Sequence, residues 1–146
     1  MKLFQTLLGA LLLLYVPGLH SEGPITKSLQ LYGGKSLNIY LGCLNCPATH
    51  ASSIWNKASK HGNVTSSISV WNKKGEYGSR TSDMSPWNRN AKHPPIILDD
   101  EGGIYGRFTL NRDKSPTNIE WADWILNNYE EVLANLEKYR VRFGAG

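Results

Sequence analysis

The 146-residue sequence lacks the short motifs by which enzymes are usually recognised. It contains no nucleophile elbow and no catalytic-cysteine signature, and its acidic residues do not have the spacing of an EF-hand. It has no apolar run long enough to cross a bilayer comfortably, and only two cysteines, Cys43 and Cys46. The sequence therefore favours a protein that is not an enzyme, and it predicts no cofactor and no metal site.

The two cysteines close a Cys-x2-Cys loop. In an exported chain an even pair normally oxidises, so we predict a structural disulfide between Cys43 and Cys46. A redox role is an alternative, although such a pair typically stands at a helix N-terminus. Zinc is another alternative, with His50 and His61 as the nearest further ligands, but this spacing matches no common finger.

The N-terminus has the pattern of a secretory signal. A single Lys2 precedes the apolar run Leu3–Val16, which Pro17-Gly18 ends. We predict a signal peptide over residues 1–21, a single domain over residues 22–146, and a secreted or periplasmic location. No transmembrane helix is expected in the mature chain.

One five-residue sequence motif, the repeated phrase, occurs three times at a fixed interval between residues 53 and 95. The copies are Ser53–Lys57, Ser69–Lys73 and Ser85–Arg89, so that Trp55, Trp71 and Trp87 are 16 residues apart. Six residues after each Trp stands an aromatic or imidazole ring, and the next residue is Gly62, Gly78 or Pro94. This is an internal repeat. It is rich in Ser, Asn, Gly and Thr, which predicts compact turns rather than helices or strands.

Hairpins flank the repeats on both sides. Residues 28–44 (hairpin A) and 96–110 (hairpin B) each show two strand-like runs joined by a Gly-containing turn. In hairpin A, Leu37, Ile39, Leu41 and Cys43 alternate with polar or small residues, which predicts one buried face. The acidic turn of hairpin B, residues 99–103, is interpreted as a solvated turn.

The last segment predicts one amphipathic helix over residues 118–140. Thr117-x-x-Glu120 resembles a capping box, and acidic residues precede basic ones along the segment. Apolar residues recur at helical spacing at Ala122, Ile125, Tyr129, Val132, Leu133 and Leu136. The predicted fold class is α+β: a small antiparallel sheet of two hairpins flanks the loop-rich repeat, and the helix closes the core.

The Trp-Asn-cation phrases are the candidate binding residues. They are Trp55, Asn56, Lys57, Trp71, Asn72, Lys73, Trp87, Asn88 and Arg89. Exposed Trp rings beside amides and cations would suit a sugar, because ring faces stack and amides bind hydroxyls. Burial of the repeated Trp residues against one another is the alternative, and we favour it.

The charge is uneven. Residues 50–95 carry seven basic and two acidic residues, whereas residues 96–146 carry six basic and nine acidic ones. A basic middle attracts anionic surfaces. The partner expected on this basis is a cell-envelope glycan or another anionic polymer, and no signal specific for nucleic acid is present. The alternative is that these basic residues only form a solvated face of the protein.

The repeats also resemble a family. Together with Tyr40–Cys46 and Gly103–Gly106, the Trp-Asn phrases and Tyr77-Gly78-Ser79 are similar to small exported bacterial proteins of unknown function that are built on Trp-Asn and Tyr-Gly-Ser repeats. The resemblance covers roughly residues 38–112 and supplies no catalytic residues. The function expected is that of an exported, non-enzymatic binding or envelope-associated protein. The alternative is a small secreted hydrolase or cell-wall-active enzyme that uses His50, His61, His93 or Cys43.

Overall fold

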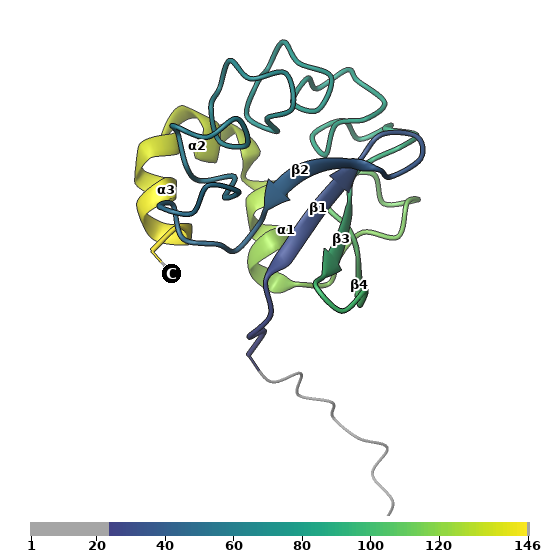
Figure 1. Ribbon diagram of the computed structural model, residues 1–146. Helices are drawn as coiled ribbons and strands as arrows, with labels where there is room; N and C mark the ends of the chain where they lie inside the picture. The colour runs from purple at the N-terminus through teal and green to yellow at the C-terminus, as the bar shows by residue number, and fades with distance from the viewer. Residues whose placement is uncertain (1–23, 146) are drawn as a thin grey trace, which may run out of the picture.

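The computed structural model describes residues 24–145, in which both hairpins join one four-stranded antiparallel sheet (Figure 1). The strands are β1 (Leu29–Gly33), β2 (Ile39–Cys43), β3 (Ile96–Asp99) and β4 (Ile104–Arg107), in the order β2-β1-β3-β4. Strands β1 and β3 pair with Leu31 opposite Ile97, so the two hairpins meet in the middle of the sheet. The α+β class and the two hairpins around a loop-rich middle are confirmed. The predicted signal peptide lies outside the described residues.

Hairpin A contains an irregularity that the alternation pattern did not predict. Leu31 pairs with Gly42 and Tyr32 pairs with Tyr40, so Leu41 is an extra residue in β2. A bulge of this kind shifts the alternation of side chains. Leu41 and Cys43 are buried as predicted, whereas Ile39 is 37% exposed. Gly42 has a φ of 126°, a conformation that disfavours a side chain there.

Hairpin B turns around Asp99, which is buried rather than solvated. The Asp99 carboxylate accepts hydrogen bonds from the Glu101 and Gly103 N–H groups and from the Tyr105 hydroxyl. These bonds, that of Gly103 foremost, lower the pKa of Asp99 to about 2. The interpretation of residues 99–103 as a solvated turn is therefore wrong for Asp99, although Asp100 and Glu101 are exposed.

The C-terminal segment forms three short helices in place of the single helix predicted for residues 118–140. They are α1 (Glu120–Asn127), α2 (Tyr129–Ala134) and α3 (Leu136–Phe143). Asn128 and Asn135 separate them, with ψ angles of 25° and 40° instead of the helical value near −42°. Their side-chain amides donate to the carbonyls of Trp124 and Glu131, four residues back. Such local bonds compete with a continuous helix.

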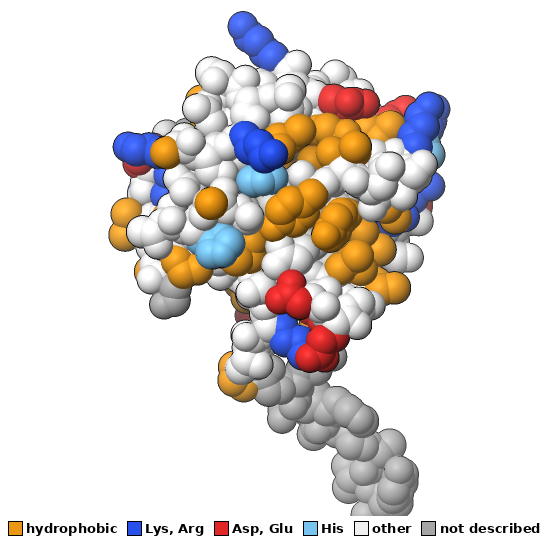
Figure 2. Space-filling model, in the orientation of Figure 1, with side chains coloured by type: hydrophobic (Ala, Val, Ile, Leu, Met, Phe, Trp, Pro, Cys, Tyr) orange, Lys and Arg blue, Asp and Glu red, His pale blue; other side chains and the backbone are white. Residues whose placement is uncertain are grey.

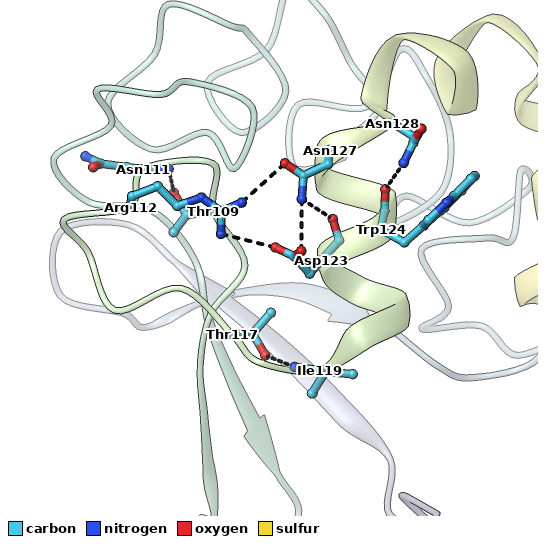
Figure 3. A network of polar contacts seen from close by, with 9 residues as sticks. All are labelled: Thr109, Asn111, Arg112, Thr117, Ile119, Asp123, Trp124, Asn127 and Asn128. Atoms are coloured by element: carbon cyan, nitrogen blue, oxygen red, sulfur yellow. Dashed lines mark hydrogen bonds and ion pairs between the residues drawn. The ribbon is translucent and has the colours of Figure 1, made fainter.

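Polar contacts link α1 to the segment that precedes it (Figure 3). The Thr117 hydroxyl accepts a hydrogen bond from the Ile119 N–H group, and no side chain caps the helix, so the expected capping box does not form. Arg112 instead bonds Asp123 and Asn127 on the exposed side of α1.

The helices complete one core. Helix α1 lies behind the sheet, and α2 and α3 lie beside the repeat segment (Figure 1). Of the six residues predicted at helical spacing, Leu133 is only half-buried and the other five are buried. Among residues 24–145, no helix has the length and hydropathy to cross a membrane.

Candidate functional site

The repeat segment is a chain of tight turns, and the turns explain the 16-residue period. From Ser53 to Ser85, backbone N–H groups donate to carbonyls three or four residues back. The accepting carbonyls belong to Ser53, Asn56, Ser59, Asn63, Ser66, Ser69, Asn72, Gly75, Ser79 and Ser82. From residue 53 to 69, and again from 69 to 85, four steps of three residues and one of four separate these positions. Compact looped turns were predicted here.

The Ser and Asn side chains at these positions hold the turns together. Ser53, Ser69 and Ser85 each accept a hydrogen bond from the N–H group of the Trp two residues later. The side-chain amide oxygens of Asn56, Asn72 and Asn88 each accept a hydrogen bond from the N–H group of the residue two positions later. Each of these amides also donates to a carbonyl six residues back. The three Asn residues of the repeated phrase therefore have a structural role.

The three repeated Trp side chains pack against one another inside the core. Trp55 and Trp71 have ring centroids 5.1 Å apart, and Trp71 and Trp87 have centroids 5.5 Å apart. Each ring is at most 2% exposed. Phe143 of α3 stacks on Trp55 at 5.3 Å, and Tyr129 of α2 stacks on Trp87 at 4.2 Å. We call this series from Phe143 to Tyr129 the aromatic column.

Hydrogen bonds tie the column to the backbone of the preceding turn. The indole Nε1 of Trp71 donates to the Ile54 carbonyl, and that of Trp87 donates to the Val70 carbonyl, both at 2.6 Å. Trp55 makes the equivalent bond to Leu44 at 2.9 Å. Buried polar groups need such partners. The indole faces are thus occupied by packing, and they are not available to a sugar.

The glycines after the repeated rings are required for steric reasons. A Cβ atom on Gly62 or Gly78 would stand 2.1 Å from the carbonyl oxygen of Asn56 or Asn72. The chain passes too close to its own turn for any side chain there. The rings that precede them, His61 and Tyr77, are buried as packing residues. His61 meets Tyr40 edge-on with centroids 5.1 Å apart, and burial lowers its pKa.

The cations of the repeat segment face outward. In Figure 2, Lys and Arg side chains project from the upper part of the molecule, where Figure 1 places this segment. All seven basic residues between 50 and 95 are exposed. Lys57, Arg80 and Lys92 have carboxylates within 4 Å, at Glu137, Glu130 and Asp83. Among residues 24–145, no carboxylate lies within 4 Å of the other four, Lys60, Lys73, Lys74 and Arg89.

Each copy of the repeat borders a hollow that helical residues also line. The central hollow has a volume of about 580 Å³ and contains Lys73, Lys74, Asn72 and Leu133, together with Val64, Thr65 and Trp71. No acidic residue lines it. The hollow at the first copy has about 490 Å³ and contains Lys57, and the hollow at the third copy has about 250 Å³ and contains Arg89.

The nine candidate residues thus divide into two groups. Trp55, Trp71, Trp87 and their Asn neighbours build the turns and the column, whereas Lys57, Lys73 and Arg89 are exposed beside the hollows. Lys74 and Leu133 also line the central hollow, and no pattern in the sequence indicated that a helix would complete it. Lys74 could have been predicted as a further binding residue, since it directly follows the second copy of the repeated phrase.

Of the groups considered for catalysis, Cys43 and His50 already have partners. Cys43 and Cys46 form the predicted disulfide, with Cα atoms 5.5 Å apart. His50 is exposed, and its Nδ1 accepts a hydrogen bond from the Ser52 N–H group. No group of three or more His, Cys, Asp or Glu side chains in residues 24–145 is placed to hold a metal ion.

Compared with known proteins, the chain matches no family model, no curated protein and no solved structure.

Proposed function

We propose that this is an exported, non-enzymatic binding protein whose repeat segment contacts an anionic glycan or another anionic polymer of a cell envelope. The observation that carries the proposal is the central hollow, which contains Lys73 and Lys74 and no acidic residue. These ammonium groups have no carboxylate within 4 Å among residues 24–145. Their charge is available to phosphate or carboxylate groups of a ligand.

The chemistry of the hollow suits a substituted sugar better than a bare ion. Lys73 and Lys74 supply cations, the Thr65 hydroxyl offers a hydrogen bond to a sugar hydroxyl, and Val64 and Leu133 supply apolar surface. Arg80 and Arg89 place further cations at the next hollow, which Glu130 and Glu131 also line. A polymer with regularly spaced negative groups would contact both positions at once.

The experiment measures retention of the purified protein on isolated cell envelopes and on an anionic polysaccharide at low salt. Charge reversal of Lys73, Lys74 and Arg89 to Glu should abolish retention, because these exposed cations make the contact. Retention of the unchanged protein should fall as the salt concentration rises, since the Debye length falls from about 10 Å at 0.1 M to about 3 Å at 1 M.

The matched control reverses Lys35, Lys114 and Lys138, which lie outside the repeats and give the same change in net charge. This variant should be retained like the unchanged protein. Equal loss of retention in both variants would mean that net charge alone causes the loss. Full retention of the repeat variant would refute the proposal. Degradation of peptidoglycan or peptide that His61→Ala stops would establish the enzyme instead.

Export is part of the same proposal and rests on the N-terminal sequence. Lys2, the apolar run and Pro17-Gly18 predict cleavage near Gly18 or Ser21. Mass spectrometry of protein recovered from outside the cytoplasm should therefore show a shortened chain. An intact Met1 in cytosolic material would contradict export.

A further inference from the structure

The hollow at the first repeat differs in chemistry from the central one. It has a volume of about 490 Å³ and lies between the Trp55–Ala58 turn and helix α3. Its lining is mostly apolar, with Ala48, Ala58, Val141 and Ala145 among the residues that form it. Val141 is 74% exposed, although it is a large apolar residue. An exposed apolar surface inside a hollow favours an apolar ligand.

A buried cation lines the same hollow. The Arg140 side chain is only 7% exposed, and two of its nitrogens donate to the carbonyls of Trp55 and Gly62. Its third nitrogen, Nε, has no hydrogen-bond partner among the described residues. Buried polar groups are normally paired, and an unpaired one requires an explanation. A ligand acceptor would supply the missing partner.

The neighbouring charges show where that acceptor would lie. The Glu137 carboxylate is 3.4 Å from Arg140 Nε and 3.5 Å from Lys57 Nζ, and all three residues line the hollow. Glu137 is 71% exposed, so its side chain is free to move aside. It already places a carboxylate between the two cations, although without a hydrogen bond to Nε.

We propose that this hollow binds a carboxylate carried on an apolar group. Arg140 Nε and Lys57 receive the carboxylate, which displaces that of Glu137, while Ala58 and Val141 contact the apolar group. Burial lowers the pKa of the Arg140 guanidinium, and a second carboxylate would stabilise its charged form. The ligand class is distinct from the polymer of the proposed function, and it includes both fatty acids and the C-terminal residue of a peptide.

The test is a titration of the ¹⁵N-labelled protein, followed by the amide chemical shifts of the residues around Val141. The probes are octanoate and octanol, which share the apolar chain and differ in charge. Octanoate should produce saturable shifts, and octanol should bind at least about tenfold more weakly, because it lacks the charged partner for Arg140. N-acetyl-leucine, compared with its amide, tells whether a peptide terminus binds as well as a free fatty acid.

The decisive variants are placed at exposed neighbours, because Arg140 itself holds two backbone carbonyls. Val141→Asp puts a negative charge at the hollow and should weaken octanoate binding about tenfold or more. Its matched control is Ile104→Asp, at a residue that is 70% exposed on β4 and lines none of the hollows described above. This control should bind octanoate like the unchanged protein.

Glu137→Gln should change the affinity for octanoate in the direction opposite to Val141→Asp. Removal of the competing carboxylate should tighten octanoate binding about two- to fivefold. Glu130→Gln, at a carboxylate that pairs with Arg80 beside the third hollow, should leave it unchanged.

Three results would overturn the inference. They are absence of saturable shifts with octanoate, equal affinity for octanol, and equal affinity of the Val141→Asp and Ile104→Asp variants. A Glu137→Gln variant with unchanged octanoate affinity would contradict one part of the inference, namely that the ligand carboxylate displaces that of Glu137. None of these outcomes bears on envelope retention through Lys73, Lys74 and Arg89, so the two proposals fail separately.

Discussion

Trp71 is the middle ring of the aromatic column, and both of its faces are covered. It is 1% exposed, it packs between the tilted ring of Trp55 and the stacked ring of Trp87, and its indole nitrogen donates a hydrogen bond to the Ile54 carbonyl. A residue placed in this way links all three copies of the repeat. Its loss would affect packing and hydrogen bonding together.

Trp71→Ala should therefore lower the free energy of unfolding by about 3–5 kcal/mol, because it leaves a cavity and an unpaired carbonyl. Trp71→Phe keeps a ring and should cost less. Urea unfolding measures both, with Trp124→Ala as the control at a half-buried Trp on α1. A loss for Trp71→Ala no larger than that of the control would contradict the column.

Asp99 predicts an acid-dependent contribution to stability. Its pKa is lowered from 3.8 to about 2, first by the Gly103 N–H group, so its charged form is stabilised in the folded state. The contribution is fully present above about pH 4 and is lost as the pH falls towards about 2. Between these pH values the unchanged protein should lose more stability than Asp99→Asn in denaturant titrations. Parallel pH profiles for the two proteins would show that the bonds to Asp99 are absent.

At the scale of elements, the helices divide between core and surface. Leu126 at the end of α1 is 1% exposed, whereas Leu133 in α2 is half-buried and lines the central hollow. The helical spacing alone predicted Leu133 on the buried face. Tyr129, Val132 and Leu136, which follow the break at Asn128, are nevertheless buried as predicted, so Leu133 lies at the edge of the buried face.

Leu126→Ala should cost about 2–5 kcal/mol of unfolding free energy, in the range for fully buried leucines. Leu133→Ala should cost less, about 1 kcal/mol, because part of its surface already contacts water. Thermal or urea unfolding of the two variants gives the comparison. Equal costs would contradict the partial burial of Leu133 and place it in the core beside Leu126.

The elements show what local patterns predict well. Alternation and Gly-containing turns identified both hairpins, and the 16-residue period identified the repeat, because these signals come from neighbouring residues. The bulge at Leu41 and the helix breaks at Asn128 and Asn135 were not predicted. Asn is only a moderately poor helix former, so a single Asn does not mark an end without its tertiary surroundings.

At the scale of the whole molecule, the column joins segments that are distant in sequence. Phe143 stacks on Trp55 across 88 positions, and Arg140 bonds the same turn through the Trp55 carbonyl. No local pattern encodes such contacts. The sequence indicated that the Trp residues pack or bind, and only the fold separates them from the exposed cations of the same phrases.

This separation is the central claim, since it gives the repeat a buried structural side and an exposed basic side. Hydrogen exchange of the five indole N–H groups, followed by NMR in heavy water, tests it most directly. Trp55, Trp71 and Trp87 donate to buried carbonyls and should exchange slowly, whereas the half-buried Trp121 and Trp124 should exchange fast. Three slow indoles assigned to the repeat would support the account, and rapid exchange at all five would contradict it.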